Sequence, residues 1–489
     1  MDNFWLWVAA LLSSAWVIAG IALRVAALGI IPGNRKPSTG MAWLLVILFA
    51  PLVGLIAFAF FGSSRLGRRR HDRQERAHRA IAERSGGHPD RVEVAGHLGS
   101  IVALNEKLGS MPLTGGNHAE LIEDYAGSIE AMIAAIGTAE QFVHVEFYIT
   151  ALDEVTRPFF DALDAATSRG VHVKLLFDHL GSRAIPGYDE LVERLEASSI
   201  DFRAMLPLQL FKGRYRRPDL RNHRKLVVVD GHLGFMGSQN LTEPSYNKAK
   251  NRKRGRTWVE LMVRLRGPVV AELDAVFAAD WYTESDELLT VTPPSPPEHA
   301  EGAESAGLAC QLVPSGPGLV AENNLRLFGA LIHAAQRRVS LTSPYFVPDE
   351  SLLYAVTTAA HRGLEVELFV SEVSDQFMVG HAQNSFYRAL LEAGVRIHRY
   401  PAPYVLHAKH FTIDDSVAVI GSSNMDMRSF ALNYEISLML LGPGIVGQMR
   451  AVEDHYRELS SELTLEEWAR RSAPAKYVDN VMRLTSALQ

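Results

Sequence analysis

The sequence predicts an α/β protein built as two similar halves, preceded by an N-terminal hairpin of two transmembrane helices. Three observations support this prediction. Two uncharged apolar stretches lie near the N-terminus, an alternation of strand-like and helix-like segments occurs twice, and one polar pattern occurs once in each repeat. At 489 residues the chain exceeds one ordinary domain and can bury a large core.

The first elements are two apolar stretches, residues 4–23 and 41–61, neither of which contains a charged side chain. As helices, both are long enough to cross the roughly 30 Å hydrocarbon core of a bilayer. The alternatives are a buried core helix or a signal peptide. A signal peptide fits poorly, because only Asp2 precedes the first stretch and a second stretch follows. We therefore predict a transmembrane hairpin over residues 1–63, with a kink in the second span at Pro51.

The distribution of basic residues predicts the orientation of this hairpin. Three basic residues lie between the spans, whereas seven follow the second span: Arg65, Arg68, Arg69, Arg70, Arg73, Arg76 and Arg79. The positive-inside rule places the richer side in the cytoplasm. We expect a multi-pass protein of the cytoplasmic membrane whose catalytic region faces the cytoplasm, with residues 64–115 as a basic juxtamembrane connector.

The remaining elements are strands and helices in two similar series. Strands are expected at 142–149, 171–177, 338–346 and 364–370, with helices ending near Arg169-Gly170 and Arg362-Gly363. Such alternation predicts βαβ units and sheets covered by helices. The predicted halves are residues 116–285 and 311–460. A linker, residues 286–310, contains Pro-Pro-Ser-Pro-Pro, and a peripheral helical segment follows at 461–489.

Each half carries the same polar pattern, in which a histidine, a lysine and an aspartate are followed by Gly-Ser-x-Asn. The first copy consists of His223, Lys225, Asp230, Ser238 and Asn240; the second consists of His407, Lys409, Asp414, Ser422 and Asn424. A single copy could be an ordinary hairpin with polar surface residues. Two copies of a pattern this specific are typical of a catalytic site. Imidazole, ammonium and amide groups together suit nucleophilic attack on a phosphodiester.

The local form of each copy is predicted to be a β-hairpin. Histidine and lysine alternate at the start of a strand and therefore share one face. Asp230-Gly231 is a strong turn sequence and Asp414-Asp415 a weaker one. A return strand then brings Gly-Ser-x-Asn towards the same site, where the glycine allows close approach of a ligand.

These patterns resemble the signature of the phospholipase D superfamily, and further segments resemble its bacterial cardiolipin synthases. The sequence Asn34-Arg-Lys-Pro-Ser-Thr-Gly-Met-Ala-Trp43 and the apolar run after it are similar to the membrane hairpin of that family. Ser343-Pro-Tyr-Phe-Val-Pro-Asp349 and Ala393-Gly-Val-Arg-Ile397 also resemble its segments. The resemblance covers residues 34–445 and implies two phospholipase D-like α/β/α-sandwich halves related by a pseudo-two-fold duplication.

The resemblance implies transfer of a phosphatidyl group between two phosphatidylglycerol molecules, which gives cardiolipin and glycerol. One histidine would form a phosphohistidine, and the other would protonate the leaving oxygen and then deprotonate the incoming alcohol. The internal symmetry leaves the assignment open; resemblance to the family favours His223 as the nucleophile. Lys225 and Lys409 would neutralise phosphoryl oxygens, and Asn240 and Asn424 would donate hydrogen bonds to them. Lysines can take the place of a metal here, so no metal or other cofactor is expected.

Two glutamates are candidates to orient the histidines. Glu435 lies 28 residues after His407, and Glu260 is its counterpart in the first half; each lies seven residues before a Gly-Pro pair. A carboxylate on the second ring nitrogen fixes the tautomer of an imidazole. A strand-end surface carboxylate is the alternative for each glutamate. Asp230 and Asp414, which the family counts as active residues, are expected to brace the hairpins.

Basic residues flank the first pattern and indicate contact with an anionic lipid surface. Nine more residues separate His223 from Glu260 than separate His407 from Glu435, and the extra length falls near Lys248, Lys250, Arg252, Lys253, Arg254 and Arg256. A second group precedes the pattern: Lys212, Arg214, Arg216, Arg217 and Arg221. Each basic residue near such a surface contributes about 1 kcal/mol. A solvated charged loop is the alternative interpretation.

Composition and charge narrow the range of alternative functions. The net charge of −6 gives no indication of nucleic-acid binding, and the single cysteine, Cys310, excludes an intrachain disulfide and a cysteine-based metal cluster. A phospholipase D-type hydrolase or another phosphatidyltransferase, such as a phosphatidylserine synthase, would use the same site. A nuclease or a non-enzymatic membrane scaffold fits less well with two membrane spans and two intact patterns.

Overall fold

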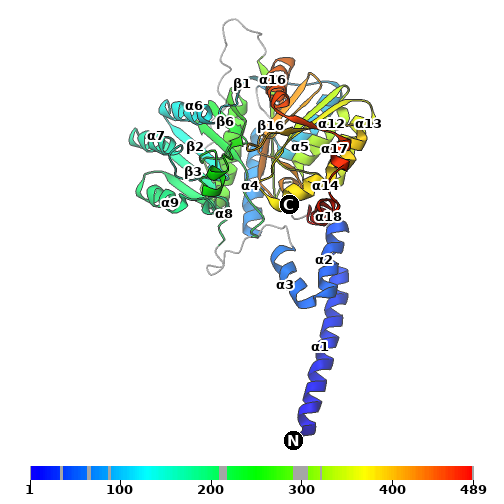
Figure 1. Ribbon diagram of the computed structural model, residues 1–489. Helices are drawn as coiled ribbons and strands as arrows, with labels where there is room; N and C mark the ends of the chain where they lie inside the picture. The colour runs from blue at the N-terminus through cyan, green and yellow to red at the C-terminus, as the bar shows by residue number, and fades with distance from the viewer. Residues whose placement is uncertain are drawn as a thin grey trace. The chain divides into compact units, whose positions relative to one another are not determined.

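The computed structural model describes residues 2–33, 37–62, 68–85, 90–208, 217–289, 307–319 and 322–486. The chain divides into two compact units, Met1–Arg65 and Leu66–Gln489, and each is described by itself (Figure 1).

The first unit consists of three helices, α1 (Asp2–Ile30), α2 (Pro37–Phe49) and α3 (Pro51–Phe61). Among the described residues, α1 is the one helix long and apolar enough to cross a membrane, over Leu11–Ile30. The second predicted span is divided into α2 and α3 at Ala50, where φ is −134° and ψ is 74°. A proline disfavours the helical conformation of the residue before it. Pro51 therefore breaks the helix at Ala50, where only a kink was expected. Residues 41–61 therefore form two shorter helices that contact each other around Gly54 and Ile47.

The second unit is organised around one mixed sheet, formed by fifteen strands of the described chain. The first half supplies seven of them: β1 (Thr114–Ile122), β2 (Phe142–Phe147), β3 (His172–Asp178), β4 (Asp201–Met205), β5 (Lys225–Val229), β6 (Leu233–Gly237) and β8 (Met262–Arg266). The second half supplies eight: β9 (Leu308–Ser315), β10 (Arg338–Thr342), β12 (Glu365–Ser371), β13 (Arg396–Tyr400), β15 (His410–Ile413), β16 (Val417–Gly421), β18 (Glu435–Leu441) and β19 (Ser461–Leu463).

The order of the strands repeats outwards from the middle of the sheet. Antiparallel pairing of β1 with β9 joins the halves, through Thr114 opposite Cys310 and Asn117 opposite Leu308. From that seam the order is β1-β8-β6-β5-β2-β3-β4 on one side and β9-β18-β16-β15-β10-β12-β13-β19 on the other. The predicted duplication therefore appears in the sheet as two similar halves, related by a pseudo-two-fold axis and joined through β1 and β9. β9 begins inside the segment predicted as a linker, whose residues 290–306 lie outside the described residues.

Helices cover both faces of the sheet and form three layers (Figure 1). One face carries α6 (Tyr125–Gly137), α7 (Arg157–Ser168) and α9 (Tyr188–Ala197) in the first half, and α12 (Asn323–Ala334), α13 (Glu350–His361) and α14 (Phe377–Ala393) in the second. The other face carries α11 (Val269–Ser285) and α16 (Pro443–Leu459). The alternation along β5 explains these layers: Val227 and Val229 join the core with α6 and α7, whereas Leu226 and Val228 join the core with α11 and α16.

The segment predicted as the basic juxtamembrane connector, residues 64–115, contains two helices that pack within this unit. α4 (Arg68–Ser85) contacts α11, and α5 (Gly96–Gly109) contacts α12 and β9. The side chain of Arg70 is 3% exposed. At the other end, the predicted helical segment 461–489 begins with the edge strand β19 and continues as α17 (Leu465–Ala469) and α18 (Ala473–Arg483), which contacts α14.

Candidate active site

The two polar patterns form hairpins, β5–β6 and β15–β16, as the sequence predicts. Asp230 and Asp414 occupy the turns, each with a φ of 49°. The carboxylate of Asp230 accepts hydrogen bonds from the backbone amides of residues 140, 141 and 142, and that of Asp414 accepts them from residues 336, 337 and 338. Both aspartates thus tie a hairpin turn to the start of the neighbouring strand, β2 or β10, and neither lines the cavity described below.

Two short backbone pairings connect the two halves next to the histidines. β7 (Trp258–Val259) pairs in parallel with β14 (Val405–Leu406), and the amide of His407 donates to the carbonyl of Val259 at 2.7 Å. The equivalent pairing joins Asn222 to Tyr434, and the amide of His223 donates to the carbonyl of Tyr434 at 2.8 Å. The residue after Val259 is Glu260 and the residue after Tyr434 is Glu435. The register therefore puts the glutamate of each half beside the histidine of the other half.

The histidine–glutamate pairs are accordingly crossed. Nδ1 of His407 lies 2.7 Å from Glu260 Oε1, and Nδ1 of His223 lies 3.0 Å from Glu435 Oε2. A carboxylate beside each histidine was predicted, and Glu260 and Glu435 lie in these places. The exchange between halves was missed, since sequence spacing carries no information about which edge of one half meets the other.

The serines of Gly-Ser-x-Asn lie behind the glutamates. The Ser422 hydroxyl donates to Glu435 Oε2 at 2.5 Å, and Ser238 is a hydrogen-bond neighbour of Glu260. Each hydroxyl also accepts the backbone amide of the residue after the glutamate, Leu261 for Ser238 and Ile436 for Ser422. Ser422 thus contacts the glutamate that lies beside His223, and neither serine lines the cavity.

Burial and charge set the protonation of the pairs. Burial lowers the pKa of His223 and of His407, each to about 4, although the adjacent glutamate opposes the shift. Burial raises the pKa of Glu260 and Glu435, but the imidazole, the lysine and the serine hydroxyl near each carboxylate together outweigh it, and both pKa values lie below the ordinary value. An ionised carboxylate can only accept a hydrogen bond, so Nδ1 of each histidine carries the proton. Nε2 is then left unprotonated, as a nucleophile requires.

Lys225 and Lys409 lie directly behind the histidines, with 0% and 3% of the residue exposed. Each ammonium donates to the backbone carbonyl of the histidine two residues earlier, at 2.5 Å. Burial lowers the pKa of Lys409 to about 8 and that of Lys225 well below its ordinary value, against the pull of both glutamates. Each lysine acts electrostatically on both histidines, so the two patterns form one charged centre.

One cavity of about 480 Å³ contains the meeting point of the halves. Its wall includes His223, His407, Asn240 and Asn424, together with the aromatic side chains Tyr148, Tyr246, Trp258 and Tyr345. Asn240 is engaged, since it donates to the Tyr246 hydroxyl at 2.8 Å and accepts from the amide of Ile149 at 3.1 Å. The side-chain oxygen of Asn424 is buried without a partner among the described residues. In the part of the chain that the structure describes, no group of three or more His, Cys, Asp or Glu residues could hold a metal ion.

Arg70, which was predicted to belong to the basic connector, lies near the His223–Glu435 pair. Arg70 of α4 donates to the Tyr434 hydroxyl at 3.3 Å and to Glu284 at 2.5 Å. The guanidinium groups of Arg70 and Arg224 lie 5.5 Å and 5.6 Å from the centre of the Tyr434 ring. Tyr434 is 1% exposed and immediately precedes Glu435. No sequence signal separates Arg70 from the exposed arginines of the same helix.

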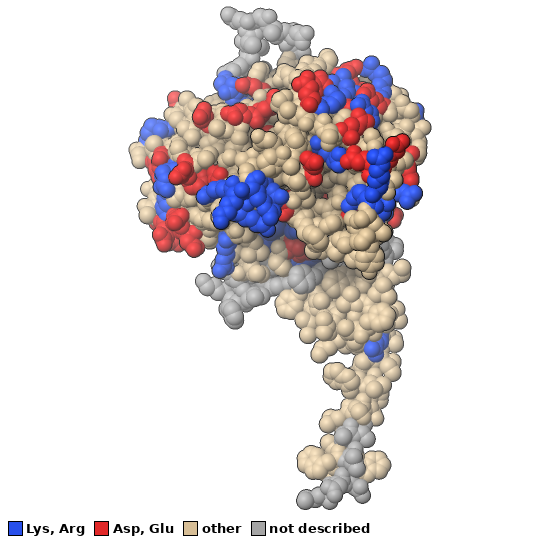
Figure 2. All heavy atoms as spheres, in the orientation of Figure 1, with Lys and Arg blue, Asp and Glu red and all other residues tan. Residues whose placement is uncertain are grey.

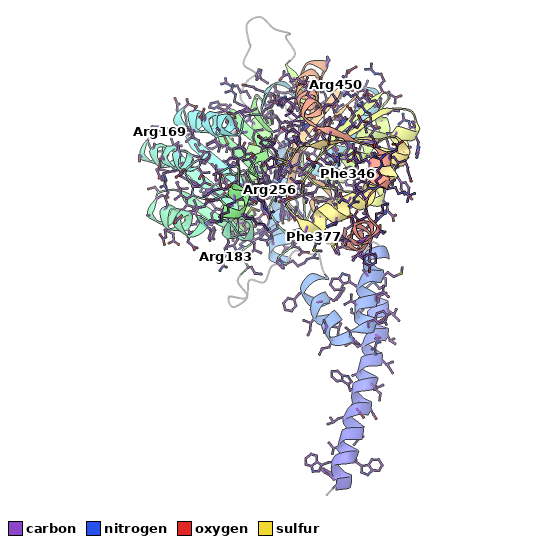
Figure 3. All side chains as sticks on the ribbon, in the orientation of Figure 1. Arg169, Arg183, Arg256, Phe346, Phe377 and Arg450 are labelled. Atoms are coloured by element: carbon purple, nitrogen blue, oxygen red, sulfur yellow. The ribbon has the colours of Figure 1, made fainter. Side chains whose placement is uncertain are left out.

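The basic segment of the first half forms the short helix α10 (Ala249–Lys253) at the mouth of the cavity. Lys248, Lys250 and Arg256 line the cavity, whereas Arg252, Lys253 and Arg254 are exposed beside it. Figure 2 shows a cluster of Lys and Arg side chains at the front of the molecule, where Figure 3 labels Arg256 between the two halves.

The second predicted group of basic residues is arranged differently. Lys212, Arg214 and Arg216 lie outside the described residues. Arg217 forms an ion pair with Asp219. Arg221 is 4% exposed and pairs at 3.0 Å with Asp178, which caps α8 (His179–Arg183) and also accepts the amide of Asn222. Arg221 therefore fixes the segment before His223 and is not available to a membrane surface, contrary to the prediction.

Comparison with known proteins gives a consistent family. The family described as "Cardiolipin synthase, PLD-like domain" matches residues 132–281 and 329–456, and "Phospholipase_D-nuclease N-terminal" matches residues 15–63. Cardiolipin synthase A of Pectobacterium carotovorum is 31% identical over 480 residues, which cover 96% of each chain. Cardiolipin synthase A of Serratia proteamaculans is 32% identical over 486 residues, again 96% of each chain.

Among solved structures, phosphatidylserine synthase of Haemophilus influenzae has a similar fold. Its TM-score is 0.59 at 14% identity, and the match covers 79% of this chain and 99% of that one.

Proposed function

This chain belongs to the cardiolipin synthases, phosphatidyltransferases of the phospholipase D superfamily, and we propose that it converts two phosphatidylglycerol molecules into cardiolipin and glycerol through a phosphohistidine. One observation carries the proposal above all others. The two crossed histidine–glutamate pairs face a single cavity, so one phosphorus atom can be reached by both imidazoles.

The first step is attack by Nε2 of His223 on the phosphorus of the donor lipid. The P–O bond to the headgroup glycerol breaks, and the leaving oxygen takes a proton from His407. We assign the nucleophile to His223 because Tyr434, next to its glutamate, is held between Arg70 and Arg224. A nucleophile that must attack in line benefits from such a fixed partner.

The acid role of His407 needs a protonated imidazole, although burial lowers the pKa of this histidine to about 4. A bound phosphodiester brings a negative charge next to the imidazole and raises its pKa. His407 is then protonated when substrate is present. In the second step His407 takes the proton of the incoming hydroxyl, whose oxygen attacks phosphorus as the N–P bond breaks.

The remaining polar groups stabilise charge or hold the frame. Lys225 and Lys409, buried behind the histidines, supply positive charge in a site with little water, where it is most effective. Asn424 has an unused side-chain group at the cavity wall, and Asn240 faces the same space. We assign Asp230 and Asp414 to bracing the hairpins and Ser238 and Ser422 to orienting the glutamates. None of these steps needs a metal.

The rim of the cavity suits a lipid substrate. Asp375, Gln376 and Val379 line the cavity, and the two residues between them, Phe377 and Met378, are 68% and 44% exposed. Figure 3 labels Phe377 at the start of α14. Exposed apolar side chains beside basic residues are typical of a surface that contacts anionic lipid.

The N-terminal unit anchors the protein to the membrane in this proposal. α1 provides one span, and the segment 41–61 provides the second arm of a hairpin, as its similarity to the N-terminal family over residues 15–63 supports. The surplus of arginines after residue 62 favours a cytoplasmic catalytic unit in a multi-pass arrangement.

The test is to give the purified full-length protein vesicles of phosphatidylglycerol and to measure cardiolipin and free glycerol. We expect both products in equal amounts. Phosphatidic acid without cardiolipin would replace this proposal with a hydrolase, and cleavage of added DNA would replace it with a nuclease. His223→Ala and His407→Ala serve as inactive controls, because each removes one of the reacting imidazoles.

A further inference from the structure

The proposed function uses phosphatidylglycerol twice, but the two molecules meet the site differently. The donor is attacked at its own phosphorus. The acceptor offers the free primary hydroxyl of its headgroup and keeps its own phosphate intact, one glycerol unit away from the attacked phosphorus. The acceptor therefore brings a second negative charge into the cavity. The histidines, lysines and asparagines of the two patterns surround the first phosphorus and do not bind this second charge.

The cavity is asymmetric in the place where that charge would lie. When His223 is the nucleophile, the leaving glycerol and the incoming hydroxyl both occupy the side of His407. The rings of Tyr246 and Tyr345 each lie 6.4 Å from the His407 ring. The Tyr345 hydroxyl donates to Asp375 at 2.8 Å, and Lys248 and Arg256 are the cations that act electrostatically on Asp375. These two cations thus lie on the acceptor side of the cavity.

Lys248 and Arg256 have charge to offer a ligand. Both line the cavity, and neither forms an ion pair with another residue that the structure describes. Arg252, in the same segment, is by contrast engaged with Glu243. Arg256 is labelled in Figure 3 at the front of the molecule, between the halves.

The segment that carries these cations exists in the first half alone. The 37 residues from His223 to Glu260 exceed the 28 from His407 to Glu435 by nine, and residues 248–256 fall in that excess. In the second half the corresponding stretch passes directly through β17 (Met425–Asp426) into α15 (Met427–Ala431). Arg428 of α15 is the one cation that this stretch contributes to the cavity, whereas residues 248–256 contribute three: Lys248, Lys250 and Arg256.

We propose that Lys248 and Arg256 bind the phosphate of the acceptor phosphatidylglycerol and so select a phosphatidyl-bearing alcohol over water and over free glycerol. Lys250, at the same wall, adds to the positive field. The carboxylate of Asp375, between these cations and Tyr345, accepts a hydrogen bond from a hydroxyl of the acceptor glycerol. The inference rests on the proposed function and identifies the substrate molecule that the basic segment recognises.

Two acceptor alcohols, free glycerol and phosphatidylglycerol, distinguish binding of the acceptor phosphate from the other steps of phosphatidyl transfer. Free glycerol attacking the phosphohistidine regenerates phosphatidylglycerol, so labelled glycerol is exchanged into the lipid. Phosphatidylglycerol attacking the same intermediate gives cardiolipin. Both reactions break the same N–P bond and pass the same proton to His407, but only the second brings an additional phosphate.

The experiment compares the full-length protein with the double variant Lys248→Gln/Arg256→Gln on phosphatidylglycerol vesicles that contain labelled glycerol. The variant loses the charge-assisted hydrogen bonds to the acceptor phosphate, so cardiolipin formation is expected to fall by at least about 10-fold. Glycerol exchange is expected to stay within about twofold, because the donor site is intact. The KM for phosphatidylglycerol in cardiolipin formation should rise, while the KM for glycerol should not.

The matched control is Lys253→Gln/Arg254→Gln, which removes the same two charges from exposed positions of the same segment. It should change both reactions alike, through weaker attachment to the vesicle. A parallel loss of exchange and cardiolipin in the Lys248/Arg256 variant would overturn the proposal, as would no loss in either reaction. So would an equally selective loss in the control. If the unmodified protein exchanges glycerol but makes no cardiolipin, the proposed function itself fails, which is a different result.

Discussion

The two halves of the catalytic unit share one plan at the histidines and differ in what surrounds them. Each half supplies a histidine, a lysine behind it, an aspartate in the turn and a glutamate for the other half's histidine. Beyond that core, Tyr434 is held by Arg70 and Arg224, whereas Val259 occupies the equivalent place beside His407. The basic helix α10 is also present in one half only. We propose that the shared core provides the chemistry and that the differences assign each histidine its role.

The largest expected effect tests that assignment directly. His223→Ala and His407→Ala should each lower cardiolipin formation by at least about 10³-fold, because a nucleophile or an acid–base group is lost. The halves should differ in the trapped intermediate. With a donor that carries a good leaving group, His407→Ala should still form a phosphohistidine on His223, detectable by mass spectrometry of acid-labile phosphate. A phosphohistidine on His407 in the His223→Ala variant would reverse the assignment.

The next effect tests the crossing of the halves. Glu435→Gln and Glu260→Gln should each reduce the turnover number by about 10²-fold or more, since the amide no longer fixes the imidazole tautomer. Nitrogen NMR of labelled histidine distinguishes the rings: Glu435→Gln should shift His223, and Glu260→Gln should shift His407. If each substitution altered the histidine of its own half instead, the crossed pairing would be wrong.

A smaller effect tests the asymmetry at Tyr434. Arg70→Met should lower the turnover number by about 10-fold, because Tyr434 and Glu435 lose one of their fixed neighbours, while the KM stays nearly constant. Arg73→Met is the matched control: Arg73 lies one turn further along α4, and its partner Asp286 is exposed. Equal losses in both variants would show that α4 contributes only to stability.

The smallest effect is on stability and tests the equivalence of the histidines. Both have a pKa of about 4 in the folded protein against 6.5 for an ordinary histidine, so between these values the unfolded chain binds more protons. The free energy of unfolding should therefore fall by up to about 3 kcal/mol per histidine as the pH drops from 6.5 to 4. Above pH 6.5 the two histidines should cause no further change.

Thermal unfolding in detergent across this pH range provides the measurement for that prediction. His223→Gln and His407→Gln should each flatten the dependence by a similar amount. A dependence that is unchanged in both variants would contradict the buried, neutral state of the imidazoles.

The fold and the membership of the site were largely accessible from the sequence, because both depend on local pattern. The continuous apolar run from Leu226 to Val229 is typical of a strand covered on both faces, and the repeat of the histidine pattern predicts the duplication. The arrangement between segments was not accessible. The crossing of Glu260 depends on the pairing of β7 with β14, which are two residues each, and that of Glu435 depends on the single bridge between Asn222 and Tyr434. Segments this short carry no periodicity. Arg70 was placed with the membrane-facing arginines, since burial against Glu284 and Tyr434 is decided by packing over more than 200 residues of separation.

The pairing of each histidine with the opposite glutamate also has an evolutionary consequence. A single half would contain a histidine and a glutamate that cannot serve each other, yet two identical copies related by a two-fold axis would complete both pairs at once. An ancestral half could thus have been active only as a homodimer. Any insertion in such an ancestor would have appeared on both sides of the site. Fusion of the two copies into one chain removed that constraint, and a segment such as α10 could then be gained by one copy while its twin kept the older form.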